Sequence, residues 1–286
     1  HFIVSQNYFK DQVIHLKINS ITIDEKKKLE EINKELKIKS LILEIKFLCL
    51  SKKITKKIYD LFKKNNLSIS NLYCSTYVKA FSYNQKFKNK KSLIFLDIGF
   101  NKTSCIILNN NKFKYFNTIA IGGNTITKDI SKILNLDYKY SEELKINFNK
   151  NEDQLYLNKS ILNNMNPFKK ILNRKNSVQL LKQVIEERVK EIINLSIYSN
   201  NPYINTNSIH KFHVIFIGSG SKILSNSFNF NEQKVLSELI FFDEKDSLIC
   251  EAGLNYFKSN ESSHTQTKKK YKKLGIFESF FNLFSK

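Results

Sequence analysis

The chain has 286 residues, of which 41% are hydrophobic and 13% aromatic, so it can form a packed core and is unlike disordered chains. Its formal net charge of +21 comes almost entirely from lysine, because the only arginines are Arg174 and Arg188. Base readout favours arginine, and neither zinc-ligand spacing nor basic–aromatic interleaving occurs, so we expect no nucleic-acid partner. The lysine excess is more simply explained by solvated faces encoded in an AT-rich genome, although it would still favour an anionic membrane surface.

The remaining composition excludes several other classes. The four cysteines (Cys49, Cys74, Cys105, Cys250) lack metal-ligand spacing, so we expect reduced, mostly buried thiols in a cytosolic protein. No apolar run reaches the roughly 18 residues of a spanning helix, and no signal peptide is visible. Because the chain begins at His1, we expect that an N-terminal part is missing.

The first 81 residues alternate strand and helix patterns. Residues 2–21 contain two strand-like stretches, 23–36 read as a charged helix, and 41–50 as a strong strand. An amphipathic helix is predicted over 51–64, capped by Ser51, with an apolar face formed by Ile54, Ile58, Leu61 and Phe62. Another helix is predicted over 72–81.

Residues 92–124 run strand, glycine turn, strand, strand, second glycine turn. Asp97 ends an apolar strand, where a carboxylate is costly unless it holds a cation, water or backbone amides. Gly99 beside it lets the main chain approach a phosphate. Gly122, Gly123 and Asn124 end another strand and open a helix, whose first amides favour an anion. Taken alone, each turn also fits a tight hairpin.

The rest of the core continues with helices over 125–134, 141–146 and 177–198, and a polar, weakly patterned stretch over 147–176. A buried strand over 213–217 then enters a third turn, Gly218-Ser219-Gly220. A strand over 236–242, a short helix over 250–257 and a flexible linker follow.

The C-terminus pairs a basic cluster with an apolar stripe. Lysines over 268–273 precede a segment whose apolar positions recur at helical spacing, too short to span a bilayer but suited to its interface. The predicted membrane-binding residues are Lys269, Lys270, Lys272, Lys273, Leu274, Phe277, Phe280, Phe281 and Phe284. Packing back on the domain, or docking on a protein, are the alternatives.

These motifs, in this order, resemble the bacterial cell-division protein FtsA family of the actin-like ATPase superfamily. The matching pieces are LDIG, IAIGGNTITKDI, SEELK, VIFIGSGSKI, EAGL and the amphipathic tail, which together span about residues 40–286. The resemblance implies an α/β fold with an actin-like (ribonuclease H-like) mixed sheet and flanking helices, mainly the second lobe, plus a C-terminal amphipathic helix. The implied domains are a first-lobe remnant over 1–72, the second lobe over 73–258 with an insert at about 125–209, a basic linker over 259–273 and a membrane helix over 274–286.

The resemblance also implies an ATP site. Asp97 would hold the Mg²⁺ shell, Gly99, Lys102 and Thr103 would contact phosphates, and Gly122, Gly123 and Asn124 would approach sugar and phosphates. Glu142 would meet the ribose and Lys145 the adenine, with Gly218, Ser219 and Gly220 on the adenine side. Without the family, Glu142 and Lys145 read as an exposed i, i+3 ion pair.

The pattern departs from the family at Phe100 and Asn101, which replace glycines, and no second Asp-x-Gly turn precedes Asp97. We therefore expect half a nucleotide cleft and at most a weak ATPase. The implied function is a tether between the FtsZ C-terminal peptide and the cytoplasmic face of the inner membrane at the septum, with self-association into filaments. A pilus- or secretion-type adaptor and a phosphotransferase fragment are the alternatives.

Overall fold

A computed structural model describes residues 10–24, 27–29, 39–148, 175–199, 201–206, 211–224, 236–245 and 247–270. Its centre is a five-stranded mixed sheet with the order β6-β5-β4-β7-β8. The strands are β4 (Ser92–Ile98), β5 (Thr103–Asn109), β6 (Lys112–Ile119), β7 (Phe212–Ile217) and β8 (Leu236–Phe241). The first three form an antiparallel meander, whereas β7 and β8 run parallel to β4.

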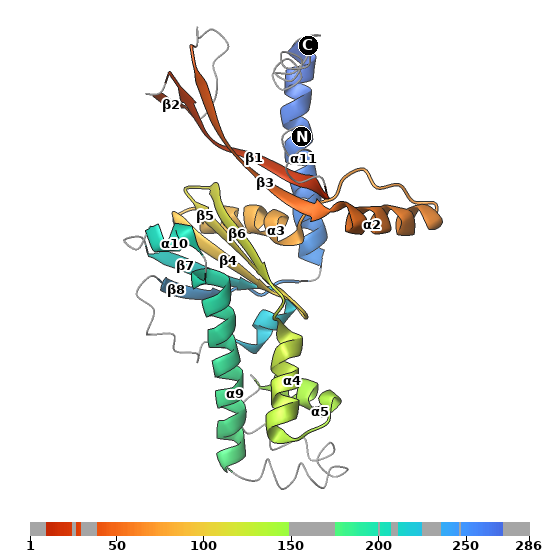
Figure 1. Cartoon of the computed structure of the whole chain (residues 1–286), viewed down its shortest axis with the longest axis vertical. Coiled ribbons are helices and arrows are strands. Elements are labelled where there is room, and N and C mark those ends of the chain that lie inside the picture. Colours follow the sequence, from red (N-terminus) through yellow and green to blue (C-terminus); the bar gives the residue numbers. More distant parts are fainter. Residues whose placement is uncertain are drawn as a thin grey trace.

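Helices cover both faces of this sheet, so β4 is buried along nearly its whole length. On one face, Ile94, Leu96 and Ile98 belong to a core shared with α4 (Gly123–Leu134) and α9 (Lys175–Ile193). On the other face, Leu93 and Phe95 share a core with α3 (Ser75–Asn84) and the start of α11 (Ser247–Lys270). Figure 1 shows this layering, with α3 and α9 on opposite sides of the sheet.

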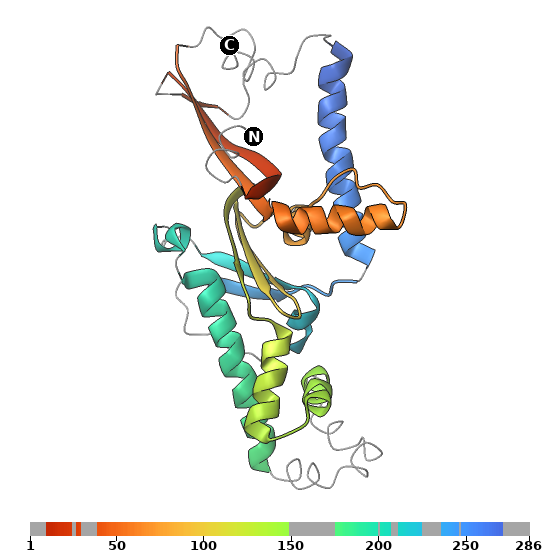
Figure 2. The ribbon, with the colours of Figure 1, turned by 45° about the vertical axis from the view of Figure 1, so that its right-hand side comes forward.

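The insert between β6 and β7 is helical where the structure describes it. Helix α5 (Tyr138–Asn147) follows α4, and α9 continues into a π-helical turn, Asn194–Tyr198, before the short α10 (Pro202–Thr206). Figure 2 shows α4, α5 and α9 extending together from one face of the sheet. Most of the polar stretch predicted over 147–176 lies outside the described residues.

A second, three-stranded sheet of order β2-β1-β3 precedes the core. Its strands are β1 (Asp11–Ile23), β2 (Lys27–Leu29) and β3 (Leu41–Ser51). The charged helix predicted over 23–36 is wrong where the structure describes it, because β2 pairs antiparallel with the end of β1. Lysine is a good helix former, but intrinsic propensity is weak compared with tertiary context, and here pairing with the edge of β1 outweighs it. The assignment of residues 1–72 to a first lobe stays a prediction.

Buried polar contacts attach this β1–β3 ribbon to the core. His15 is only 4% exposed, stacks on Tyr77 with ring centroids 4.1 Å apart, and accepts a hydrogen bond of 2.7 Å from the Cys74 backbone N–H. The Asn19 side chain donates to the Phe113 carbonyl at 2.7 Å. The ribbon is therefore fixed at its base, beside α3 and β6.

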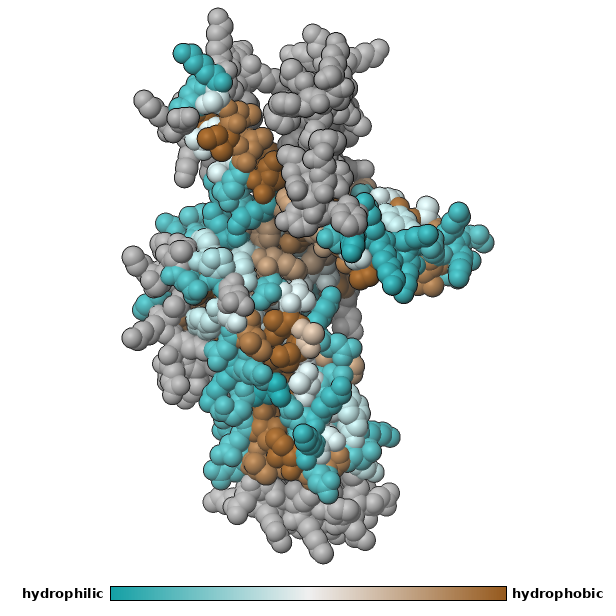
Figure 3. Space-filling model, viewed as in Figure 1, coloured by the Kyte–Doolittle hydropathy of each residue, from teal (hydrophilic) through white to brown (hydrophobic). Residues whose placement is uncertain are grey.

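Helix α2 (Lys52–Lys64) follows the ribbon, as predicted, but two details differ. Ser51 occupies the N-cap position without a side-chain capping hydrogen bond. The predicted apolar face is largely open, because Ile54, Leu61 and Phe62 are exposed and only Thr55 is buried. Figure 3 shows further hydrophobic residues along the ribbon, where Leu41, Ile42 and Ile45 are exposed.

The C-terminal helix is longer than the sequence predicts. A short helix over 250–257 and a flexible linker after it were expected, but α11 runs without interruption to Lys270. Serine, asparagine and threonine are unfavourable in a helix by only a few tenths of a kcal/mol each, and neither glycine nor proline lies between Leu254 and Lys270 to stop it. The linker prediction is therefore wrong up to Lys270, and residues 271–286 lie outside the described residues.

Candidate functional site

The side chain of Asp97 faces α3 because of the alternation along β4. Leu93 and Phe95 point toward α3, and Asp97, two residues further on, takes the same face at the carboxyl end of the strand. On α3, the polar residues Thr76, Lys79 and Tyr83 follow at i, i+3 and i+7 and therefore share one face of the helix. A buried strand and a helix thus bring an acidic group and its partners together.

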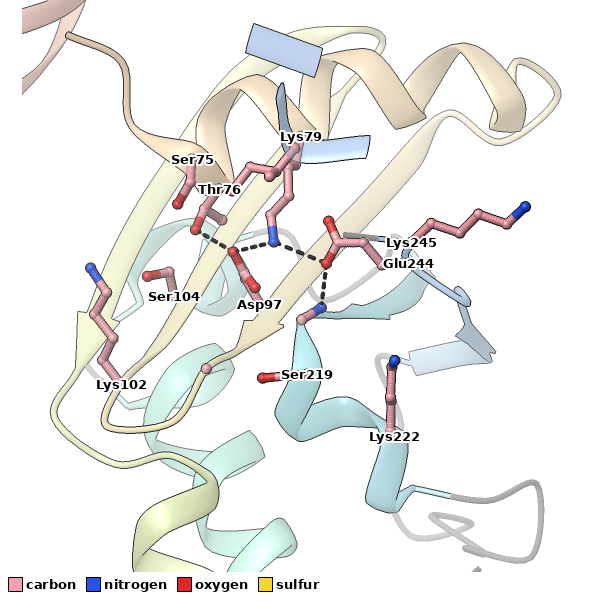
Figure 4. Close-up of a pocket in the computed structure, with 13 residues that line it drawn as sticks. Ser75, Thr76, Lys79, Asp97, Lys102, Ser104, Ser219, Lys222, Glu244 and Lys245 are labelled. Atoms are coloured by element: carbon pink, nitrogen blue, oxygen red, sulfur yellow. Dashed lines mark hydrogen bonds and ion pairs between the residues drawn. The ribbon is translucent and has the colours of Figure 1, made fainter. Parts of the chain in front are cut away.

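Lys79 lies between two carboxylates (Figure 4). Its Nζ is 2.9 Å from Asp97 Oδ2 and 3.2 Å from Glu244 Oε2, and the side chain is 5% exposed. Thr76 Oγ1 also donates to Asp97 Oδ2, at 2.7 Å. A charge this deeply buried is tolerated because it is paired and hydrogen-bonded, and removing one partner of such a pair typically costs about 3–5 kcal/mol.

Glu244, which follows β8, connects this cluster to the third glycine turn. Its Oε1 accepts a hydrogen bond of 2.6 Å from the Tyr83 hydroxyl, and its Oε2 accepts one of 2.9 Å from the Gly218 backbone N–H. Burial, and then the hydrogen bond to the Glu244 carboxylate, raise the pKa of Tyr83 well above its ordinary value, so its hydroxyl stays a donor. Both oxygens of Glu244 are therefore engaged.

The first two glycine turns are hydrogen-bonded directly to each other. The Gly123 N–H donates to the Gly99 carbonyl at 2.9 Å, and the Asn124 N–H donates to the Phe100 carbonyl at 2.8 Å. Gly122 allows this approach, since a Cβ there would lie 2.5 Å from the Gly99 oxygen. These two amides at the start of α4, which the sequence predicted to face an anion, are already used within the chain.

A cavity of about 310 Å³ opens at this end of the sheet, between the Asp97 cluster and the turns. Four lysines and two carboxylates line it, which leaves a net charge of +2. The lining also offers the hydroxyls of Ser75, Thr76, Ser104 and Ser219. Cationic and hydroxyl donors around an open cavity suit an anion such as a phosphate group. The charged lining residues are Lys79, Lys102, Lys222, Lys245, Asp97 and Glu244.

The structure places five of the twelve residues that the sequence predicted for this site in the lining of the cavity. Asp97, Gly99, Lys102, Gly218 and Ser219 line the cavity. The others lie beside it, and Thr103 donates its hydroxyl to the Ile121 carbonyl at 2.8 Å. Their contacts to a nucleotide stay predictions; they are Thr103, Gly122, Gly123, Asn124, Glu142, Lys145 and Gly220.

Glu142 and Lys145 form a network at the start of α4. Lys145 Nζ donates to the Gly123 carbonyl at 3.1 Å, to Thr127 Oγ1 at 2.8 Å and to Glu142 Oε2 at 2.6 Å. The lysine side chain is 10% exposed and the glutamate side chain 29%. The alternative interpretation as an exposed ion pair is therefore wrong for Lys145, which ties α5 to the second glycine turn.

Sequence reasoning missed Thr76, Lys79, Lys222, Glu244 and Lys245. The spacing of Thr76, Lys79 and Tyr83 along one face of the helix was a usable signal, because buried polar residues need partners. Nothing local marks Glu244, which lies 165 residues from Lys79 in the sequence.

A magnesium ion bound directly by Asp97 does not fit this arrangement. The Lys79 ammonium and the Thr76 hydroxyl occupy Oδ2, and Oδ1 packs so closely on Gly218 that a Cβ there would lie 2.5 Å away. Within the described residues, no cluster of three or more histidine, cysteine or acidic side chains has the arrangement of a metal site. The expectation that Asp97 holds the Mg²⁺ shell is therefore not supported, because its carboxylate is already paired with Lys79.

The predicted membrane-binding segment cannot be placed, because residues 271–286 lie outside the described residues and the side chains of Lys269 and Lys270 are not described. A search of the described helices finds none with the length and hydrophobicity to cross a membrane.

Comparison with solved structures shows an actin-like fold. The chain resembles MreB5 of Spiroplasma citri bound to ADP, with a TM-score of 0.52 and 11% identity over 76% of this chain and 68% of that one. It also resembles a PilM–PilN type IV pilus biogenesis complex, with a TM-score of 0.51 and 12% identity over 88% of this chain and 61% of that one. At these identities the likeness shows the fold alone.

Comparison of sequences is more specific. Residues 94–205 match the family model of the cell division protein FtsA. A curated cell division protein FtsA from Buchnera aphidicola subsp. Baizongia pistaciae (strain Bp) is 27% identical over 159 residues. The match covers 51% of this chain and 34% of the relative, so the chain spans about a third of the length of that protein. The family model covers the strands and turns around Asp97, so this part of the chain is similar to the FtsA-like family of actin-like ATPases.

Proposed function

We propose that this protein acts in bacterial cell division as an actin-like tether between the FtsZ ring and the cytoplasmic face of the membrane at the septum. The match of residues 94–205 to the FtsA family carries this proposal. The basic and apolar pattern of the C-terminus supports the membrane part, since each lysine near an anionic leaflet contributes about 1 kcal/mol.

In this proposal the membrane contact is the C-terminal amphipathic segment. A buried phenylalanine contributes roughly 1.5–3 kcal/mol before the cost of ordering, so several of them with a lysine cluster support reversible attachment. The segment would lie in the interface with Leu274, Phe277, Phe281 and Phe284 toward the lipid.

Co-sedimentation with vesicles of increasing anionic lipid content tests this attachment. The intact chain is compared with a chain ending at Thr267 and with the double variant Phe277→Glu/Phe281→Glu. A matched control, Ser279→Glu/Asn282→Glu, adds the same charge to the polar face of the predicted helix. We expect the intact chain and the control to pellet with acidic vesicles, and the other two to stay in solution. Identical behaviour of all four chains would exclude the tail as the membrane anchor.

We further propose that the insert at about residues 125–209 receives the acidic C-terminal peptide of FtsZ. Exposed lysines on its described helices, Lys128 and Lys132 on α4 and Lys139 on α5, would favour such a peptide. Fluorescence anisotropy of the labelled peptide measures this binding. The affinity should fall as the salt concentration rises, and a salt-independent or absent signal would contradict the proposal. Self-association into actin-like filaments belongs to the same proposal, and its test is sedimentation with and without nucleotide.

In this proposal a nucleotide is a structural ligand that favours one arrangement of the chain, rather than a substrate whose hydrolysis drives the function. The cavity beside Asp97 has space and positive charge for phosphate groups, through Lys102, Lys222 and Lys245. ATP belongs to this proposed function, but a direct contact between Asp97 and Mg²⁺ does not, since the Asp97 carboxylate is paired with Lys79.

A further inference from the structure

The cavity beside Asp97 already contains a cation that belongs to the protein. Lys79 Nζ lies within 3.2 Å of oxygens from both Asp97 and Glu244, two carboxylates from separate strand ends. A divalent cation between carboxylates and a phosphate serves to cancel negative charge on both sides. An ammonium held at the same carboxylates cancels part of that charge without being exchangeable.

The rest of the cavity supplies the remaining positive charge. Lys102, Lys222 and Lys245 come from three different segments, and Figure 4 shows their side chains spread around the opening. Asp97 and Glu244 are both engaged by Lys79, and the described lining of the cavity contains no further carboxylate, so its net charge is +2. Charge-assisted hydrogen bonds from lysine to phosphate oxygens are about twice as strong as neutral ones.

We propose that this cavity binds phosphate-bearing anions without a divalent cation, with the Lys79 ammonium held where a metal would otherwise stand. This inference rests on the nucleotide part of the proposed function and names its cation requirement. The ligand class is a nucleoside polyphosphate or a free polyphosphate, which share the same phosphate chemistry. The hydroxyls of Ser75 and Ser219 at the cavity wall would complete the contacts.

Isothermal titration of the full chain with ATP, in EDTA and in excess MgCl₂, tests the inference, and inorganic tripolyphosphate as a second probe separates the two ligand sources. We expect the Kd for ATP in EDTA to lie within about threefold of the Kd in MgCl₂, because fixed lysines replace the metal. A Kd at least about 30-fold weaker in EDTA overturns the inference while leaving nucleotide binding intact. Failure to bind ATP and tripolyphosphate in both buffers overturns the inference and the nucleotide part of the proposed function, but not the membrane part.

Variants locate the effect at Lys79. Lys79→Met keeps the length of the side chain and removes its charge, so binding in EDTA should weaken about 10-fold or more and MgCl₂ should partly restore it. Lys102→Met leaves the Lys79 pairs intact, so it should weaken binding in both buffers without changing their ratio. Lys88→Met, exposed and outside the cavity lining, is the matched control. If Lys79→Met fails to fold, the inference is still tested by the ratio of the Kd values in EDTA and in MgCl₂, measured for the unmodified chain and for Lys102→Met. If Lys79→Met folds and loses the same affinity in both buffers, the inference is overturned.

Discussion

Gly218 and Asp97 are so close that no side chain fits between them: a Cβ on Gly218 would lie 2.5 Å from Asp97 Oδ1. The glycine also has φ +86°, a conformation that other residues rarely adopt. Its N–H donates to Glu244, so one residue connects the end of β7 with both carboxylates of the cluster. The parallel pairing of β4 and β7 places the two segments side by side.

Gly218→Ala should therefore destabilise the protein by at least about 2 kcal/mol, since the backbone conformation alone costs about 1–3 kcal/mol for a residue with a side chain. Urea unfolding measures the change. The matched control is Gly253→Ala in α11, where a Cβ meets nothing within 4 Å and the helix gains up to about 1 kcal/mol. Equal unfolding midpoints for the two variants would contradict the assigned role of Gly218.

Much of the central sheet is predictable from the sequence, because β4, β5 and β7 are largely apolar runs that end at a glycine or asparagine. The order of strand, glycine turn, strand and strand predicted over residues 92–124 is the order of β4, β5 and β6. Local sequence patterns mispredict an element where its conformation depends on a partner that is distant in the sequence. The β2 strand forms because β1 offers it an edge, and α3 begins at Ser75 rather than at residue 72.

The site follows the same rule. Asp97, Gly99 and Gly218 were found because a turn after a buried strand is a local signal. Lys79 and Glu244 were missed because only the folded sheet brings α3 and the segment after β8 to the same strand end. The engagement of the α4 amides by the Gly99–Phe100 turn is likewise a tertiary contact that a helix-start pattern does not reveal.

Arg188 is expected to hold α9 against α4. Its guanidinium is bidentate on Asp129, with Nε to Oδ2 at 2.5 Å and Nη2 to Oδ1 at 3.1 Å, and both side chains are about three-quarters buried. Arg188→Ala should cost about 1–3 kcal/mol in urea unfolding, and Arg188→Lys should recover only part, because lysine lacks the planar fork.

The control for that variant is Lys182→Ala on the same helix. Its ion pair with Glu186 is long, at 3.9 Å, and more exposed, so the expected loss is below about 0.5 kcal/mol. If the two alanine variants lower the free energy of unfolding equally, the Arg188–Asp129 pair does not fix α9 against α4.

The four cysteines should react with a thiol reagent in a defined order. Cys250 is exposed, whereas Cys105 is fully buried and burial raises the pKa of its thiol to about 12. Because the thiolate is the reactive form, the thiol of Cys250 should be labelled rapidly at mildly alkaline pH, and that of Cys105 only on unfolding. Mass spectrometry of the labelled peptides identifies the site, and Cys250→Ser should remove the rapid phase. Rapid labelling of Cys105 in the native protein would contradict the burial of β5.

Acid should release the ribbon from the core through His15. Desolvation by burial lowers the pKa of His15 from 6.5 to about 4, and its ring faces Tyr73, Tyr77 and Tyr256 while Nε2 accepts from the Cys74 N–H. Because the folded-state pKa lies below the unfolded one, protonation favours unfolding. The stabilisation is complete above pH 6.5 and is lost as the pH falls from 6.5 toward 4.

Between pH 7.5 and 5.0 the linkage amounts to about 2 kcal/mol of unfolding free energy from this one group. His15→Leu removes the titrating ring and leaves the Cys74 N–H without its acceptor, so the variant should be less stable at pH 7.5 but lose less stability on acidification. Urea unfolding at the two pH values measures both effects. His213 on β7, about one-quarter exposed and near Glu238, provides the control, because His213→Leu leaves the buried ring of His15 unchanged. An equal loss of stability between the two pH values in the unmodified chain and in His15→Leu would show that protonation of His15 does not oppose folding.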